Sequence, residues 1–341
     1  MKTVSLTDIC TPRQHKQLNK KNLSTSGHPV YGANGVIGCY HEYNQKSPVI
    51  ALGCRGNCCG SVHITAPCSY VTANALCLEN LSEDVSIDYL YHYLKQYDFS
   101  ALISGAAQPQ LTAKRLRKIQ VPCPPIEQQQ HIATILSQAD QCIQLRKEQL
   151  AQLQLLRQTC FLDAMEGVKR RGAYTERRLG HIAHIHCGKR NAGEMDEDGM
   201  YPLFTCAKEP RKIKQYAYDC ECVLVSGNID FHVHYYKGKF DAYQRIYIIE
   251  SKNKKRTLVS FLHAYLEHYL PQLQAQAIGG VMKYLKRYML TEFPLILPSA
   301  AEQARIVAQL AEVKTIQANA QEALTREELL FKTLQHQYFA Y

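Results

Sequence analysis

Two stretches of the sequence decide the fold: GAAQPQL at residues 105–111 and GGVMKYL at residues 279–285. The shift that relates these stretches also places Pro124 on Pro298 and Gln129 on Gln303. The shift is 174 residues, and self-similarity at this separation indicates two copies of one structural unit in a single chain. The match is strong at the C-terminal end of each copy and fades towards its start, so the front parts have diverged.

Both copies show the same order of structural signals. An irregular front region contains short β-branched runs, such as residues 47–52 and 222–225, that predict strands. An amphipathic helix is expected at residues 87–97 in the first copy and 258–269 in the second. Each copy then reaches Pro124-Pro125 or Pro298, and a proline of this kind is typical of the first turn of a helix.

Beyond these prolines both copies are expected to be helical for about 40 residues. The apolar residues that mark the helical seam follow a 4-3 spacing and include Ile132, Leu136, Ile143 and Leu150 in the first copy and Ile306, Leu310, Val313 and Leu324 in the second. A period near 3.5 residues, sustained this long, predicts coiled-coil spacer helices rather than helices lying on a globular core.

The predicted fold class is α+β, with two tandem, strand-rich recognition domains separated by two long antiparallel coiled-coil helices in a pseudo-twofold arrangement. We expect the first recognition domain at residues 1–123 and the central helical spacer at 124–166. The second recognition domain is expected at residues 167–297 and the C-terminal spacer at 298–341. Two like units in one chain would place the recognition domains at opposite ends of a rigid spacer.

The net charge of +10 is distributed unevenly along the chain. Residues 1–123 hold 12 Lys and Arg against 7 Asp and Glu, and residues 167–297 hold 21 against 13. The two spacer segments are mildly acidic, with 3 against 5 and 4 against 5. A basic excess confined to two segments favours two surfaces that face a polyanion such as double-stranded DNA.

Neither a membrane segment nor a metal site is expected. No stretch approaches 18 consecutive apolar residues and the N-terminus lacks the apolar core of a signal peptide, so we expect a cytoplasmic protein. The 14 cysteines are then expected to be reduced. The cysteines that invite a zinc interpretation lack paired C-x2-C spacing: Cys54, Cys58, Cys59 and Cys68. His232 and His234 lack further ligands nearby in the sequence.

No catalytic centre is expected in this chain. The sequence holds no Asn-Pro-Pro-Tyr/Phe run of an amino-methyltransferase, no phosphate-binding GxxxxGK[ST] loop, no HExxH helix and no GxSxG turn.

Several motifs carry a resemblance to a known family. The run YGANGVIG at residues 31–38, GCRG at 53–56, GAAQPQL at 105–111 and PPIEQQ at 124–129 occur in an order that resembles the specificity subunit of type I restriction-modification systems. The resemblance covers essentially the whole chain. It departs from the family at Gln128, where the second copy keeps Glu302, at Pro298-Ser299 in place of two prolines, and in the second front region, which lacks the Gly-rich signatures.

The resemblance implies a subunit that reads a bipartite, asymmetric DNA target. It also implies partnership with two modification subunits, which bring S-adenosylmethionine, and with restriction subunits that translocate and cut. This chain would itself hold no cofactor. The alternatives are an orphan or decoy specificity subunit, a coiled-coil scaffold that does not bind DNA, and a self-contained restriction enzyme.

Side chains of the kind that read bases or bind phosphates mark candidate DNA contacts in each front region. In the first they are Tyr31, Asn34, Arg55 and Asn57, of which Arg55 and Asn57 lie in a Gly-rich loop where a backbone can approach a ligand closely. In the second they are Lys189, Arg190, Asn228, Lys237, Lys239 and Arg245.

Overall fold

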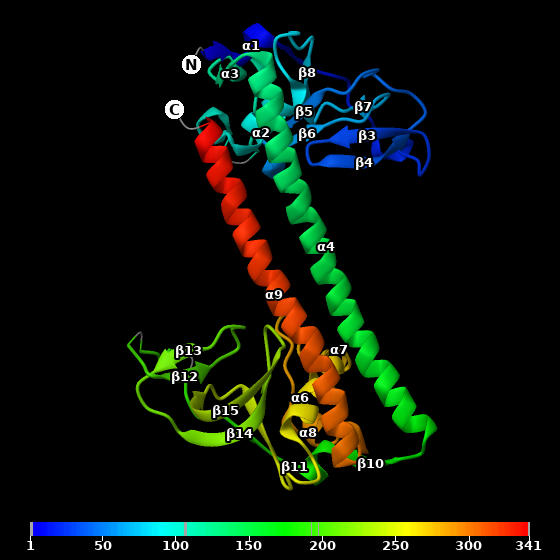
Figure 1. Ribbon diagram of the computed structural model, residues 1–341, viewed down its shortest axis with the longest axis vertical. Helices are drawn as coiled ribbons and strands as arrows, with labels where there is room; N and C mark the ends of the chain where they lie inside the picture. The colour runs from blue at the N-terminus through cyan, green and yellow to red at the C-terminus, as the bar shows by residue number, and fades with distance from the viewer. Residues whose placement is uncertain (1–2, 106–107, 192, 197, 340–341) are drawn as a thin grey trace. The chain divides into compact units, whose positions relative to one another are not determined.

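The computed structural model describes residues 3–105, 108–191, 193–196 and 198–339 (Figure 1). The chain divides into two compact units. Unit 1 comprises Met1–Lys147 and Glu322–Tyr341, and unit 2 comprises Glu148–Gln321. Each unit therefore contains a recognition domain and a part of both long helices. None of the described helices is long and apolar enough to cross a membrane.

Unit 1 begins with the first recognition domain, which matches the first copy seen in the sequence. Its elements in chain order are β1 (Thr3–Ser5), α1 (Leu6–Ile9), β2 (Thr11–Gln14), η1 (Lys20–Asn22), β3 (His28–Gly32), β4 (Gly35–Tyr40), β5 (Ile50–Gly53), η2 (Gly56–Cys58), β6 (Val62–Ile64), β7 (Tyr70–Val71), β8 (Ala75–Glu79), α2 (Ile87–Gln96), η3 (Ser100–Leu102), α3 (Ala113–Leu116) and β9 (Gln120–Pro122).

The strands of unit 1 form a four-stranded sheet in the order β2-β8-β5-β6, a three-stranded sheet β4-β3-β7 and the pair β1-β9. Side chains alternate between the two faces of a strand. On β8, Leu76 and Leu78 therefore pack with Leu90 of α2 in the main core, whereas Ala75 and Cys77 point to the opposite face. The predicted helix at 87–97 is present as α2, and Ser86 caps it by accepting a hydrogen bond from the Tyr89 N–H.

Unit 2 contains the second recognition domain. Its elements in chain order are β10 (Tyr174–Arg178), α5 (Leu179–Ile182), β11 (Ala183–Cys187), β12 (Tyr201–Phe204), β13 (Arg211–Ile213), β14 (Tyr218–Ser226), β15 (Val233–Ala242), β16 (Ile246–Ser251), α6 (Val259–His268), α7 (Leu270–Gln276), α8 (Arg287–Thr291) and β17 (Pro294–Pro298).

The strands of unit 2 form one six-stranded sheet, in the order β11-β16-β14-β15-β12-β13, and the pair β10-β17. One face of the sheet, with Val223 and Ile249, packs against α6 in the larger core. The opposite face holds a second apolar cluster that includes Phe204, Phe240 and Ile248. The predicted helix at 258–269 is present as α6, and the run at 222–225 lies within β14.

The two long helices are α4 (Ile126–Arg170) and α9 (Ala300–Phe339). In unit 1 the first part of α4 runs antiparallel to the last part of α9, as Figure 1 shows, and the Arg146 and Glu327 side chains form an ion pair of 2.8 Å. In unit 2 the end of α4 packs with the start of α9 around Phe161 and Ile306. Helix α4 continues four residues past the range expected for the central spacer.

The residues that the spacing places on the helical seam are mostly buried. Ile132, Leu136 and Ile143 of α4 are buried, and Leu150 is half-buried. On α9 the buried residues are Ile306, Leu310, Val313 and Leu324. At the start of α4 the seam also packs against the first recognition domain, because Ile132 and Leu136 belong to the core of that domain.

The internal repeat is visible in matching backbone arrangements. Strand β1 pairs antiparallel with β9, and β10 pairs in the same way with β17, so each recognition domain is closed where it meets a long helix. Gln129 and Gln303 are fully buried just after these strands. The Gln129 amide donates to the carbonyl oxygens of Asp84 and Pro124 and accepts from the Ser86 N–H.

Gln303 makes the corresponding three hydrogen bonds. Its amide donates to the carbonyl oxygens of Arg256 and Pro298 at 2.9 and 2.8 Å, and it accepts from the Leu258 N–H at 2.9 Å. Buried amide groups need such partners, because an unpaired polar group is costly away from water. The repeat is therefore conserved in hydrogen bonding as well as in sequence order.

Candidate nucleic-acid interface

Three loops of unit 1 converge at one end of its strands. They are the β3–β4 turn at residues 32–35, the β5–β6 loop at 53–61 and the described residues of 104–110. The Ser61 hydroxyl donates to the Cys58 carbonyl oxygen at 2.7 Å and also contacts that of Ala33. The Gly56 N–H donates to the Pro109 carbonyl oxygen at 2.9 Å. We call these three loops loop cluster 1.

The predicted residues of unit 1 divide into exposed and structural ones. Asn34, Arg55 and Asn57 are exposed on loop cluster 1, and the Arg55 side chain makes no hydrogen bond or ion pair with another described residue. Tyr31 is only 8% exposed, and its hydroxyl accepts a hydrogen bond from the Ala66 N–H at 3.0 Å. Tyr31 therefore supports the loops from inside, whereas the other three side chains face solvent.

Unit 2 has a corresponding group of loops, which we call loop cluster 2: residues 187–190, 226–229, 244–246 and 278–287. Its segments are joined by backbone hydrogen bonds. The Gly227 N–H donates to the Arg245 carbonyl oxygen at 2.8 Å, and the Leu285 N–H donates to that of Gly227 at 2.7 Å. The Gly188 N–H donates to the Ile246 carbonyl oxygen at 2.9 Å.

Lys189 and Arg245 are the predicted residues that loop cluster 2 brings together on its surface, and both are exposed. Burial raises the pKa of the neighbouring Cys187 thiol, and the guanidinium groups of Arg287 and Arg245 act in the opposite direction. Both guanidinium groups therefore act on the same thiol, which lies two residues before Lys189 in the chain. A surface of this charge attracts anions such as DNA phosphates.

Two other predicted residues of loop cluster 2, Arg190 and Asn228, make side-chain contacts within the domain. Arg190 forms an ion pair of 2.7 Å with Asp241, which is fully buried, and one of 3.1 Å with Glu194. The Asn228 side-chain oxygen accepts a hydrogen bond from the Cys206 thiol at 2.6 Å. Arg190 therefore stabilises the domain, whereas Asn228 is held in place by this bond and stays half-exposed, so it can still contact a ligand.

Lys237 and Lys239 lie outside loop cluster 2, on the β14–β15 ribbon. Each lies opposite an acidic residue of β14, Lys237 opposite Glu221 and Lys239 opposite Asp219. The Lys239 ammonium group also lies 4.8 Å from the centre of the Tyr216 ring. Opposite charges on facing strands offset much of the attraction that these lysines would exert on a phosphate.

The two loop clusters are built on the same backbone frame. Arg55 bridges to Gln110 in cluster 1, and Asn228 bridges to Tyr284 in cluster 2. The repeat shift relates Gln110 to Tyr284, so Arg55 and Asn228 occupy equivalent positions. Gly105 and its counterpart Gly279 both have positive φ, at 90° and 124°. A side chain at either glycine would collide with the carbonyl oxygen three residues later.

Several exposed cations near the clusters were missed by the sequence analysis. Lys283, Lys286 and Arg287 are exposed on loop cluster 2, and Lys16 is exposed at the position equivalent to Lys189. The repeat itself carried the signal for the first three, since they lie in or directly after the second copy of the 105–111 element. Lys16 can be found only through the strand register that aligns β2 with β11.

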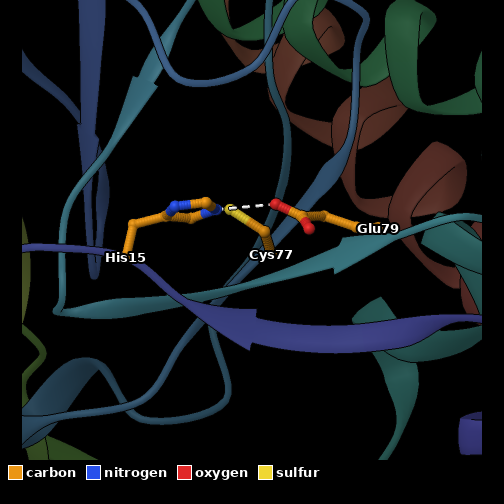
Figure 2. Close-up of side chains that lie close together, drawn as sticks. All are labelled: His15, Cys77 and Glu79. Atoms are coloured by element: carbon orange, nitrogen blue, oxygen red, sulfur yellow. Dashed lines mark hydrogen bonds and ion pairs between the residues drawn. The ribbon is translucent and has the colours of Figure 1, made fainter.

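Three of the cysteines whose spacing invited a zinc interpretation form hydrogen bonds to different backbone groups. The thiols of Cys54, Cys59 and Cys68 donate to the carbonyl oxygens of Ala73, Pro109 and Lys46, respectively. His232 and His234 lie with their rings 4.6 Å apart, and burial lowers the pKa of His234 to about 4. A different group of metal-ligating side chains, formed by His15, Cys77 and Glu79, lies in unit 1 (Figure 2).

Comparison with known proteins shows the family to which this chain belongs. The profile described as Type I restriction modification DNA specificity domain matches residues 1–155 and again residues 172–326. A solved structure of the S subunit of a type I restriction-modification system from M. genitalium superimposes with a TM-score of 0.71 at 15% identity. That superposition covers 98% of this chain and 94% of the solved chain, and at this identity it shows the fold alone.

Curated relatives are named as specificity subunits of type I restriction enzymes. The type I restriction enzyme EcoDI specificity subunit of Escherichia coli is 36% identical over 132 residues, which are 39% of this chain. This match and one to the EcoprrI specificity subunit span less than a third of those relatives, 29% and 28% of their lengths. A Haemophilus influenzae protein named as a type I restriction enzyme specificity subunit is 25% identical over 89% of this chain and 85% of its own length.

Proposed function

Since this chain belongs to the type I restriction-modification DNA specificity family, we propose that it is the subunit that selects the DNA sequence for a type I restriction-modification complex. Loop cluster 1 would read one part of the target and loop cluster 2 the other. The target is then bipartite, and it is asymmetric because the two clusters present different side chains.

One observation supports this proposal above the others. Arg55 and Asn228 occupy equivalent backbone positions in two frames that share their hydrogen bonds. An arginine donates two hydrogen bonds to guanine and an asparagine pairs with adenine, so this substitution changes which base edge is complementary. A repeated frame that carries different recognition groups is what two different half-sites require.

The remaining exposed residues suggest a division of roles. Asn34 and Asn57 of loop cluster 1 can donate and accept hydrogen bonds at base edges. Lys189 and Arg245 of loop cluster 2 are better suited to phosphates, which fix the orientation of a protein on the duplex without reading its sequence. Loop cluster 2 would therefore contribute the larger share of the salt-dependent affinity.

We propose that the chemistry lies in partner subunits. Two modification subunits would bind S-adenosylmethionine and methylate adenine, and restriction subunits would translocate and cut the DNA. This chain would hold no cofactor and no catalytic group. It would act in the cytoplasm, with the DNA and the partner subunits.

The experiment that tests this function uses the chain assembled with its modification subunits. The complex is supplied with S-adenosylmethionine and a DNA library, and the methylated positions are identified by sequencing. We expect two unlike half-sites separated by a gap of fixed length. A single contiguous site, or methylation without sequence preference, would contradict the proposal.

Salt dependence distinguishes DNA binding from a scaffold role. Each phosphate contact displaces condensed counterions, so the logarithm of a specific DNA affinity falls steeply with the logarithm of salt concentration. A coiled-coil scaffold predicts no such slope. An orphan or decoy subunit would still bind DNA or the modification subunits. The complex that it forms would not methylate the DNA that it binds.

A further inference from the structure

Three metal-ligating side chains of unit 1 converge at the edge of its four-stranded sheet. Cys77 and Glu79 are two residues apart on β8, so they point to the same face, and His15 directly follows the neighbouring strand β2. The imidazole, thiol and carboxylate atoms lie within 4.8 Å of one another. Figure 2 shows the three side chains meeting from opposite sides at one point.

The hydrogen bonds at this point cannot all be satisfied by the protein alone. The His15 Nε2 atom lies 2.6 Å from Glu79 Oε1, and the Gln45 side-chain nitrogen lies 2.9 Å from the first atom and 2.8 Å from the second. These three atoms form a nearly equilateral triangle with angles of about 60°, whereas the two amide hydrogens diverge by about 120°. Gln45 can therefore donate well to only one of the two.

The protonation state of His15 does not remove this conflict. If His15 Nε2 carries a proton and donates it to Glu79, this nitrogen cannot accept a hydrogen bond from the Gln45 amide. Two N–H donors then face each other. If it carries none, two acceptors, His15 Nε2 and Glu79 Oε1, lie 2.6 Å apart. A cation at this point would use both lone pairs at once, and Gln45 could turn its amide to present the oxygen.

The set of donor atoms selects the kind of cation. A thiolate, an imidazole and a carboxylate suit Zn²⁺, whereas Mg²⁺ and Ca²⁺ prefer oxygen ligands only. With neutral His15, the charges of Cys77 and Glu79 balance a divalent ion. Binding would release the Cys77 thiol proton, because a cysteine binds zinc as the thiolate.

A cation can reach this point from solvent. Cys77 is fully buried, but the His15 and Glu79 side chains retain 19% and 14% of their exposure. Arg13, which pairs with Glu79 at 3.4 Å, is 61% exposed and can turn away. The site is thus closed on one side by the sheet and open on the other.

Unit 2 indicates why unit 1 would need an additional stabilising element. The strand register makes Ile248 of β16 equivalent to Cys77 of β8. Ile248 packs with Phe204 and Phe240 in an apolar cluster on its sheet face. The same face of unit 1 holds a smaller cluster made of Tyr31, Ala51, Val71, Ala75 and Cys77. Small cores of this kind are often stabilised by a bound metal.

We propose that His15, Cys77 and Glu79 form a structural zinc site in the first recognition domain, with the Gln45 side-chain oxygen or water as the fourth ligand. The ion joins the end of β2, the loop before β5 and the middle of β8. It stabilises the sheet that carries loop cluster 1 and takes no part in DNA contact. The site is independent of the function proposed for the chain.

The first test uses Co²⁺ as a spectroscopic substitute for Zn²⁺ in the full-length chain after removal of bound metal with a chelator. We expect one equivalent of Co²⁺ to give the visible bands of a tetrahedral ion and a sulfur-to-metal charge-transfer band. Zn²⁺ should displace it with the same stoichiometry. An octahedral spectrum, or one without the sulfur band, would overturn the proposal even if every variant failed to fold.

The second test compares variants. Cys77→Ser and His15→Gln should each lower the Zn²⁺ affinity by more than the roughly 10–100-fold that loss of an outer-shell partner costs. The matched control is Cys222→Ser, which removes an equally buried thiol from the sheet of unit 2. Zinc should raise the Tm of the wild type and of Cys222→Ser but not that of His15→Gln. Equal zinc binding by all of these proteins would refute the site.

Discussion

The two sheets differ most on the faces that point away from α2 and α6. In unit 2 that face is filled by aromatic and aliphatic side chains, among them Phe204 and Phe240. In unit 1 it holds a smaller cluster of Tyr31, Val71, two alanines and a cysteine, beside a polar group around His15. The strand register and the glutamine hydrogen bonds are nonetheless the same in both units. A shared backbone frame can therefore be stabilised by different interior chemistry.

The largest expected effect tests the apolar face of unit 2. Phe240 is fully buried, and its ring centre lies 5.3 Å from that of Tyr218 and 5.7 Å from that of Phe204. Phe240→Ala should lower the free energy of unfolding by about 3–5 kcal/mol, because it leaves a cavity. Val71→Ala on the corresponding face of unit 1 should cost roughly half as much. Equal losses in urea denaturation would remove the contrast between the faces.

The second prediction concerns what the units share. Gln129→Leu and Gln303→Leu each remove a buried amide that makes three hydrogen bonds to backbone groups and should each cost about 3 kcal/mol. Hydrogen exchange at the start of α2 reports the first change, and exchange at the start of α6 reports the second. Gln130→Leu, at an exposed neighbouring position, serves as the control. A large effect from only one of the two glutamines would mean that the frames are not equivalent.

The third prediction uses pH. Burial lowers the pKa of His92 to about 4, with Lys95 acting in the same direction. The unfolded chain binds a proton near pH 6.5, whereas folded His92 stays neutral down to about pH 4. Stability should therefore fall by about 2–3 kcal/mol as the pH drops from 6.5 to 4. His92→Gln should flatten this part of the curve in unit 1, and His234→Gln should do the same in unit 2.

The fourth prediction separates the half-sites. Arg55→Ala and Asn228→Ala should each reduce discrimination by about 1–3 kcal/mol, roughly tenfold to hundredfold in relative affinity. Each variant should relax only one half of the target, which methylation of a randomised DNA library would reveal. If either substitution relaxed both halves, the assignment of one cluster to each half-site would be wrong.

The smallest effect is expected from Lys237 and Lys239, which face acidic residues across the ribbon. Replacing both with alanine should change stability and DNA affinity by less than about 0.5 kcal/mol each. The same double substitution at Lys189 and Arg245 should lower the salt slope of DNA binding by about 2. An equal fall in the salt slope for both double variants would indicate that the DNA-facing surface extends to β15.

Local patterns were sufficient to predict the helices and the repeat. Entry prolines and a sustained apolar period lead to α4 and α9, and the 105–111 element leads to the equivalent loop at 279–285. The pairings of distant segments were not predictable in this way. No signal near Arg190 indicates its ion pair with Asp241, and none near Tyr31 indicates that its hydroxyl supports Ala66. Both residues were predicted as DNA contacts from their chemistry, and both make contacts inside their own domains.

The same limit explains the metal-ligating group. Closely spaced cysteines such as Cys54 and Cys58 are the kind of sequence signal that indicates zinc. His15 and Cys77 are brought together only by the pairing of β2 with β8, whose residues are far apart in the chain. Glu79 joins them because it lies two residues after Cys77 on the same strand, and side chains two residues apart point to the same face. The sequence shows this spacing once the strand pairing is known.

The paired strands that close each recognition domain have an evolutionary consequence. Because β1 lies against β9 and β10 against β17, the chain enters and leaves each domain at neighbouring points. A cassette with adjacent ends can be replaced by recombination without disturbing the helices that receive it. Under the proposed function, one genetic exchange would alter half of the recognised sequence and leave the other half intact. A lineage could then acquire new specificities by shuffling cassettes, without rebuilding the assembly.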